Sequence, residues 1–235
     1  MIASVPASVD ADDIHAVVAA NIAALEALSR DESFGVHQLC AGLYAKAYQT
    51  LLAHFESQPN PAFTYLVMVR FHDLFVHRVI QPALAGKKAT TAHWGRYADL
   101  AARSTMSSSV GRHLGLLSRG ARAHVRFDLV DAICLAFADH QRLFGHDPDL
   151  DAAGSHLLGT PTDDVFYRAA LEYNALHRNS QRGWRRAQLV LHAQVARLTR
   201  LFWLAVLQSW RRAAWRDAME ILVARGACRS ERTAS

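Results

Sequence analysis

Two pairs of histidine and aspartate, each spaced by one helical turn, are the residues best suited to chemistry in this sequence. His124 and Asp128 lie four positions apart, and Asp73 and His77 repeat the spacing in the opposite order. Residues four apart project from the same face of a helix. An imidazole and a carboxylate there could ligate one metal ion, share one proton, or hold each other in a core.

The second pair lies in a segment, Phe63 to Ile80, that is apolar on nearly every side. Ionisable groups in such a buried helix must be paired, neutralised or bound to something. If this helix packs antiparallel to the helix that carries His124, the two pairs can meet, as in the metal sites of helical bundles. Two nitrogen and two oxygen ligands suit zinc, iron or manganese. The predicted ligands of zinc or another divalent transition metal are therefore Asp73, His77, His124 and Asp128.

Further polar residues are candidates for catalysis and for a pocket. His72 and His177 are the predicted proton carriers, and Tyr173 and Asn174 form a polar helix face that could line a small-molecule pocket. The functional roles of the His–Asp pairs and of His177 have structural alternatives. The His–Asp pairs could be local hydrogen bonds between buried polar groups, and His177 could simply complement the negative end of its own helix.

The elements that position these residues are predicted to be helices throughout. Apolar residues recur at helical spacing, starting after a capping Asp10, and Gly and Pro are few. We predict an all-α, single-domain bundle of about seven or eight helices over residues 10–225, with flexible ends at 1–9 and 226–235. Residues 82–93 and 145–162 are predicted as loops. Residues 110–144 and 184–224 each read as one long or kinked helix.

Composition narrows the class of protein. Hydrophobic residues make up 51% of the 235 residues and charged residues 20%, which is typical of a globular chain. No apolar run is long enough for a transmembrane segment, no secretory signal is evident, and the three cysteines form no disulfide or metal pattern. These features favour a cytoplasmic location. The net charge of +5 comes with no aromatic–basic motif, so nucleic-acid binding is not expected.

The segment from Leu114 to Leu129 resembles the central signature of a bacterial family known only as domain of unknown function 5995. The matching residues are a Gly followed by Ala-His-hydrophobic-x-x-Asp-Leu, with later likenesses at 164–174 and 211–218. More distantly, Gly120, His124 and Asp128 resemble the zinc-ligand helix of the all-helical zinc-dependent phospholipase C group. That group's N-terminal Trp ligand and closing His-x-x-x-Glu are absent, so the resemblance implies a site of one or two metal ions.

Three functions follow as hypotheses. The first is a metal-dependent hydrolase in which a metal-bound water attacks a hydrophobic or ester-like small molecule. The second is a metal-free helical pocket that binds, cyclises or otherwise tailors a small lipophilic metabolite. The third is a non-catalytic interaction module, with a homo-oligomer formed through the C-terminal helix that carries Arg211, Arg212, Trp215 and Arg216.

Overall fold

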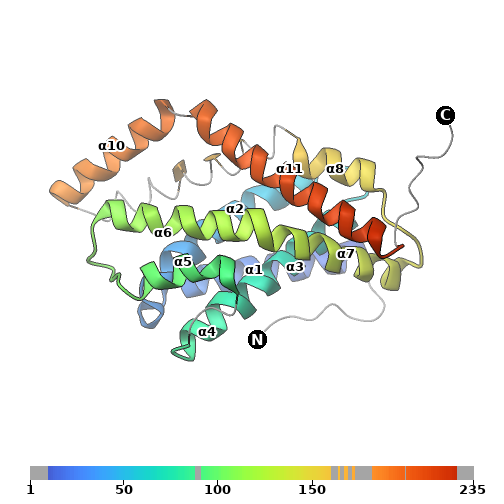
Figure 1. The fold of residues 1–235 in the computed structure, drawn as a ribbon, viewed down its shortest axis with the longest axis horizontal. Coiled ribbons are helices and arrows are strands. Elements are labelled where there is room, and N and C mark those ends of the chain that lie inside the picture. The colour runs from blue at the N-terminus through green and yellow to red at the C-terminus, as the bar shows by residue number, and fades with distance from the viewer. Residues whose placement is uncertain are drawn as a thin grey trace.

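In the computed structural model, helices and the turns that join them make up the described residues, which are 10–87, 91–159, 164, 167–168, 171–172, 182–198 and 200–226. Figure 1 shows the helices gathered into one elongated bundle, which confirms the predicted all-α, single-domain class. The elements are α1 (Ala11–Arg30), η1 (Glu32–Phe34), α2 (His37–Phe55), α3 (Ala62–Phe75), η2 (Val76–Ile80), α4 (Gln81–Leu84), α5 (Ala92–Ala101), α6 (Val110–Ala123), η3 (His124–Asp128), α7 (Leu129–Phe144), α8 (Leu150–Leu158), α10 (Trp184–Leu198) and α11 (Arg200–Ala224).

The first helix begins where the sequence predicts. The Asp10 side chain accepts hydrogen bonds from the backbone N–H groups of Asp12 and Asp13, and the Asp13 side chain accepts one in return from the Asp10 backbone. This reciprocal cap satisfies donors that a helix start leaves unpaired. The buried face of α1 then packs on α2 and α3, and contributes Ile14, Val18, Ile22 and Leu25 to the core.

Two segments of π-helix interrupt otherwise regular helices. η2 (Val76–Ile80) continues α3, and η3 (His124–Asp128) joins α6 to α7 in one continuous run. A π-turn takes about one residue more than an α-turn, so side chains beyond it are rotated from the α-helical register. Both π segments carry residues of the predicted site. In η2, the side chains therefore do not follow the register, or form the pairing, that an unbroken α-helix implies.

Two predicted loops contain helices. In 145–162, the Asp149 side chain accepts a hydrogen bond from the backbone N–H of Ala152 and starts α8, so the loop prediction is wrong there. In 82–93, Pro82 lies in α4, which directly continues η2, and α5 already begins at Ala92, so the loop prediction is wrong at both ends. The predicted flexible ends, apart from Gly226, lie outside the described residues.

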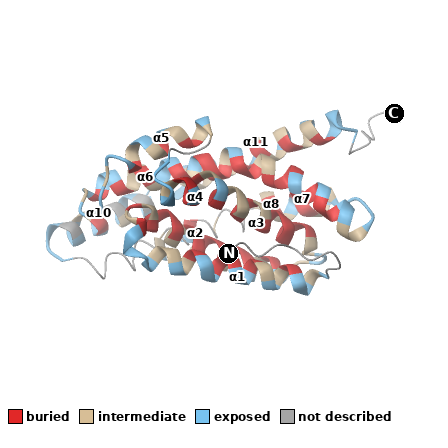
Figure 2. Cartoon of the chain, turned by 90° about the horizontal axis from the view of Figure 1, so that it is seen from below, coloured by how far each residue is buried: buried red, intermediate tan, exposed pale blue. Residues whose placement is uncertain are grey.

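The core is one cluster that joins α1, α2, α3, α5, α6, α7, α8 and α11. Figure 2 shows the buried residues concentrated on the inner helices of the bundle. The predicted buried helix is confirmed, because ten of the fourteen residues of α3 are buried.

The C-terminal helices form a bent arm over the bundle. α10 and α11 meet at an angle of 74°, so the long predicted helix is broken into two (Figure 1). Within the described residues no single helix has the length and apolarity needed to cross a membrane, although α10 and α11 together pass that test of length and composition.

Gly120 of α6 lies against α2 and α5 so closely that a side chain would not fit without movement. A Cβ atom there would lie 3.1 Å from Cys40 Sγ and 3.4 Å from the Tyr44 hydroxyl. We expect Gly120→Ala to lower the free energy of unfolding by about 1–3 kcal/mol through overpacking. Gly95→Ala in α5, where a Cβ meets nothing within 4 Å, should instead raise it by about 0.5–1 kcal/mol. Urea titrations followed by circular dichroism measure both, and equal effects of the two substitutions would contradict the close approach.

Candidate functional site

The Asp128 carboxylate is the centre of a buried polar cluster. Its side chain is fully buried, and both oxygens accept two hydrogen bonds each. Oδ1 accepts from Arg78 Nη1 at 2.5 Å and from His93 Nε2 at 2.9 Å. Oδ2 accepts from Trp94 Nε1 and His124 Nδ1, both at 3.0 Å. The carboxylate is therefore held by donors from three different helices, η2, α5 and η3.

These contacts keep Asp128 ionised. Burial by itself raises the pKa of Asp128, but hydrogen bonds from His124, His93 and Arg78 outweigh it and hold the pKa well below its usual range. Arg78 also donates through Nη2 to Asp131 at 2.5 Å, so one guanidinium joins a buried carboxylate to a half-exposed one.

His124 is neutral, with an oriented ring. Burial lowers its pKa, and the neighbouring Asp128 offsets only part of that effect. A neutral ring that donates from Nδ1 to Asp128 has its lone pair on Nε2, and the Tyr48 hydroxyl lies 3.3 Å from that nitrogen. Burial, together with the negative charge of Asp128, raises the pKa of Tyr48 well above its ordinary value, so the hydroxyl keeps its proton. Tyr48, His124 and Asp128 therefore form a hydrogen-bonded chain.

Aromatic rings fix the plane of the His124 imidazole. Phe71 stacks on it with ring centroids 3.5 Å apart and planes 3° apart. Tyr44 stacks at 4.7 Å and 25°. Trp94 lies at 6.1 Å, so the same residue that donates to Asp128 also packs near the imidazole. With two stacked rings and a bonded carboxylate, the imidazole has little freedom to reorient.

One of the two predicted His–Asp pairs, His124 and Asp128, lies in this site. The other pair, Asp73 and His77, lies outside it. His77 is exposed and its Nδ1 bonds Gln81 Oε1 at 2.9 Å. Asp73 accepts from Arg70 Nη1 at 3.1 Å. Because η2 is π-helical, Arg78 faces Asp128 where an unbroken α-helix was expected to present His77. The predicted four-ligand arrangement is thus not formed, and no three His, Cys, Asp or Glu side chains in the described chain are placed to hold a metal ion.

His72 is close to the cluster, whereas three other predicted residues cannot be placed. His72 is buried, its ring lies edge-on to Tyr48 at 6.5 Å, and its Nδ1 has no hydrogen-bond partner among the described residues. His177, Tyr173 and Asn174 lie outside the described residues. Sequence reasoning missed Tyr44, Tyr48, Arg78, His93 and Trp94. The signals available were an arginine inside the most apolar segment and a His-Trp pair at the start of a helix.

His72 predicts how the fold responds to acid. Burial and the nearby His124 lower its pKa to about 4, against about 6.5 in the unfolded chain. Between those two pH values the unfolded state binds a proton that the folded state does not, so stability falls as pH falls through this window. The full shift is worth about 3 kcal/mol. We expect His72→Leu to remove this part of the pH dependence, measured as urea unfolding free energies from neutral pH to about pH 4. Parallel curves for the two proteins would contradict the assignment.

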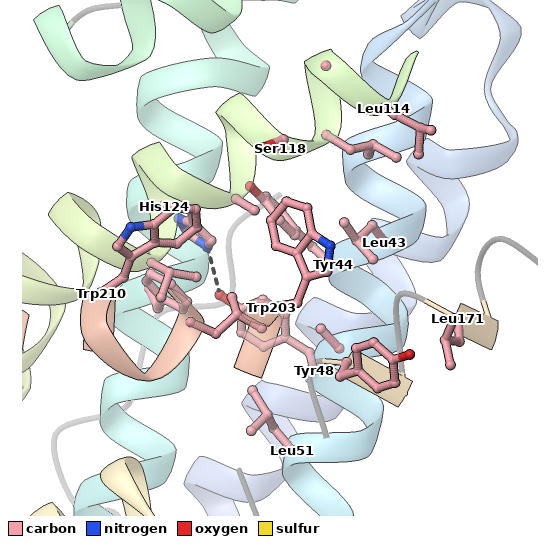
Figure 3. A pocket seen from close by; sticks show the side chains of 18 of the residues that line it. Leu43, Tyr44, Tyr48, Leu51, Leu114, Ser118, His124, Leu171, Trp203 and Trp210 are labelled. Atoms are coloured by element: carbon pink, nitrogen blue, oxygen red, sulfur yellow. Dashed lines mark hydrogen bonds between the residues drawn. The ribbon is translucent and has the colours of Figure 1, made fainter. Parts of the chain in front are cut away.

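An apolar cavity of about 480 Å³ lies against His124 and Tyr48. Figure 3 shows α2 on one side, α6 above, and the side chains of Trp203 and Trp210 from α11 among those that line the cavity. The described residues that line it are Leu43, Tyr44, Ala47, Tyr48, Leu51, Phe71, Leu114, Gly115, Leu117, Ser118, Ala121, His124, Val125, Tyr167, Leu171, Val195, Trp203, Leu207 and Trp210.

Comparison of the chain with protein-family models, with curated proteins and with solved structures found no match. The resemblances to domain of unknown function 5995 and to the zinc-dependent phospholipase C group therefore stay predictions. The site itself, an oriented Tyr48–His124–Asp128 chain beside an apolar cavity, is the feature from which a function has to be argued.

Proposed function

We propose that this protein binds a small lipophilic molecule in the cavity, with Tyr48 and His124 holding its polar end. The observation that carries this proposal is the cavity, whose lining is formed mainly by Leu, Ala, Val and aromatic side chains. Its volume of about 480 Å³ lies within the range of small-molecule sites, which combine apolar walls with a few placed polar groups.

The polar groups of the lining have a defined chemistry. The Tyr48 hydroxyl donates to His124 Nε2, so its oxygen retains lone pairs for a donor on the ligand. Asp128 fixes which nitrogen of His124 carries the proton. A ligand with an apolar body and one hydroxyl or amide donor is therefore favoured over a purely apolar one. Anionic ligands are disfavoured, because the described lining contains no Lys or Arg, and Arg78 of the adjoining polar cluster is already bound to two carboxylates.

The experiment is a titration with N-phenyl-1-naphthylamine, a neutral probe that fluoresces when it leaves water. We expect saturable binding at one site per chain, and displacement of the probe by 1-octanol. We further expect Tyr48→Phe to weaken 1-octanol about fivefold, the effect of one hydrogen bond. Non-saturable fluorescence in the wild-type protein, or no displacement by 1-octanol, would overturn the proposal.

The same hydrogen-bonded chain favours tailoring of the ligand as a second function. His124 could accept a proton from a group bound at Tyr48, and Asp128 would stabilise the imidazolium that forms. Because the two ring nitrogens already face Tyr48 and Asp128, such a transfer needs no reorientation of the ring. The metal-dependent hydrolase stays a prediction for which the described side chains supply no ligand cluster.

A further inference from the structure

The outer side of the α10–α11 arm carries large apolar residues that no part of the described chain covers. On α10, Trp184, Leu191 and Leu198 are spaced by seven residues and so form one stripe along the helix. They are 76%, 63% and 86% exposed. Leu201 and Phe202 at the start of α11 are 81% and 62% exposed. We call these five residues the arm patch, a concentration of apolar surface that a folded chain seldom leaves open to water.

The sequence of the arm itself carries charge of one sign as far as Asp217. No Asp or Glu occurs between Glu172 and Asp217, a stretch that contains eight arginines from Arg182 onward. Arg186 and Arg197 are exposed on α10, and Arg182 is exposed two residues before that helix begins. One acid from outside this stretch contacts the arm: Asp164 pairs with Arg200 at the start of α11 and with Arg168. Glu172 pairs with Lys46.

We propose that the arm patch docks the protein onto the surface of an anionic lipid bilayer. Exposed apolar and aromatic side chains on a helix that carries arginines and no acid of its own are what an interfacial helix needs to enter the headgroup region. A second copy of the chain fits the patch less well. Two such arms laid face to face would bring together the exposed Arg182, Arg186 and Arg197 of each copy, with no acid on either α10 between them.

The orientation of α11 connects this surface to the cavity. Leu201 and Phe202 face outward, whereas Trp203 and Trp210 of the same helix line the cavity on the inner side (Figure 3). A docked arm would therefore place the cavity next to the bilayer, where lipophilic molecules concentrate. The docking proposal itself needs only the exposed arm, and holds whether or not the cavity is filled.

The test is co-sedimentation of the full chain with phosphatidylcholine vesicles, prepared with and without phosphatidylglycerol. We expect binding to the anionic vesicles that weakens as salt is added, and at least tenfold weaker binding by Leu198→Gln/Leu201→Gln/Phe202→Gln. The matched control is Leu84→Gln/Leu135→Gln, which removes exposed leucines elsewhere on the surface and should bind as the wild type does. Arg182→Glu/Arg186→Glu should lose the preference for phosphatidylglycerol.

Several results would overturn the proposal. They are no sedimentation with anionic vesicles, equal binding to both vesicle types, or undiminished binding by the triple variant. A concentration-dependent dimer that the triple variant abolishes, without vesicle binding, would assign the patch to a second copy instead. Circular dichroism and binding of N-phenyl-1-naphthylamine in the triple variant check that the fold and the cavity are intact, so failure of docking and failure of ligand binding are read separately.

Discussion

Asp128→Ala is expected to lower the free energy of unfolding by about 4 kcal/mol, because it removes the only buried carboxylate that Arg78 contacts in the described chain. Four donors, from Arg78, His93, Trp94 and His124, lose their acceptor at once. A domain of this size is stable by about 5–15 kcal/mol, so the variant should be close to unfolding. Urea titration near neutral pH, followed by circular dichroism, measures the loss.

The matched control for this variant is Asp131→Ala. Asp131 contacts the same guanidinium at the same distance, 2.5 Å, but its side chain is 47% exposed. Solvent screens such a pair, so we expect a loss below about 1 kcal/mol. If both variants lost the same stability, the burial of the Asp128 cluster would not be what stabilises it, and the account of the site would be wrong.

Ala121→Phe is expected to weaken binding of N-phenyl-1-naphthylamine at least tenfold, a change of about 1.4 kcal/mol in binding free energy. Ala121 lies on α6 and lines the cavity. A phenyl ring at this position occupies the space that the ligand would take. Because it fills empty volume, stability should be kept or raised. Fluorescence titration and urea unfolding on the same preparation measure both effects.

Arg122→Phe serves as the control for cavity filling. Arg122 is the next residue of α6 and is exposed, so the same ring is added outside the cavity. We expect the affinity for the probe to stay within about twofold of the wild type, since nothing in the lining changes. Equal losses in Ala121→Phe and Arg122→Phe would place the probe somewhere other than this cavity.

The fold could be predicted where the signal is local. The cap at Asp10 and the buried helix from Phe63 follow from side chains that act on their own backbone or on their own helical face. The pairing of His124 with Asp128 is also local, four residues apart on one face. That half of the predicted site is present in the structure as a hydrogen bond.

The rest of the site depends on geometry that spacing does not contain. A π-helical turn at 76–80 places Arg78, and not His77, opposite Asp128, and helical periodicity assumes that such turns are absent. His93 and Trp94 reach Asp128 from 35 and 34 residues away. The cavity is lined by residues of α2, α6 and α11 together, which no single segment encodes. The short helix α8 was missed because its acids and glycine are typical of a loop.

The central claim, that a lipophilic molecule binds in the cavity, is tested most directly by the tryptophan indole N–H signals in ¹H–¹⁵N spectra during a titration with 1-octanol. Trp203 and Trp210 line the cavity, whereas Trp184 is 76% exposed on α10. We predict that the signals of Trp203 and Trp210 shift together with one dissociation constant, while that of Trp184 stays in place. Equal shifts at Trp184, or no shift at Trp203 and Trp210 at saturating 1-octanol, would contradict the account.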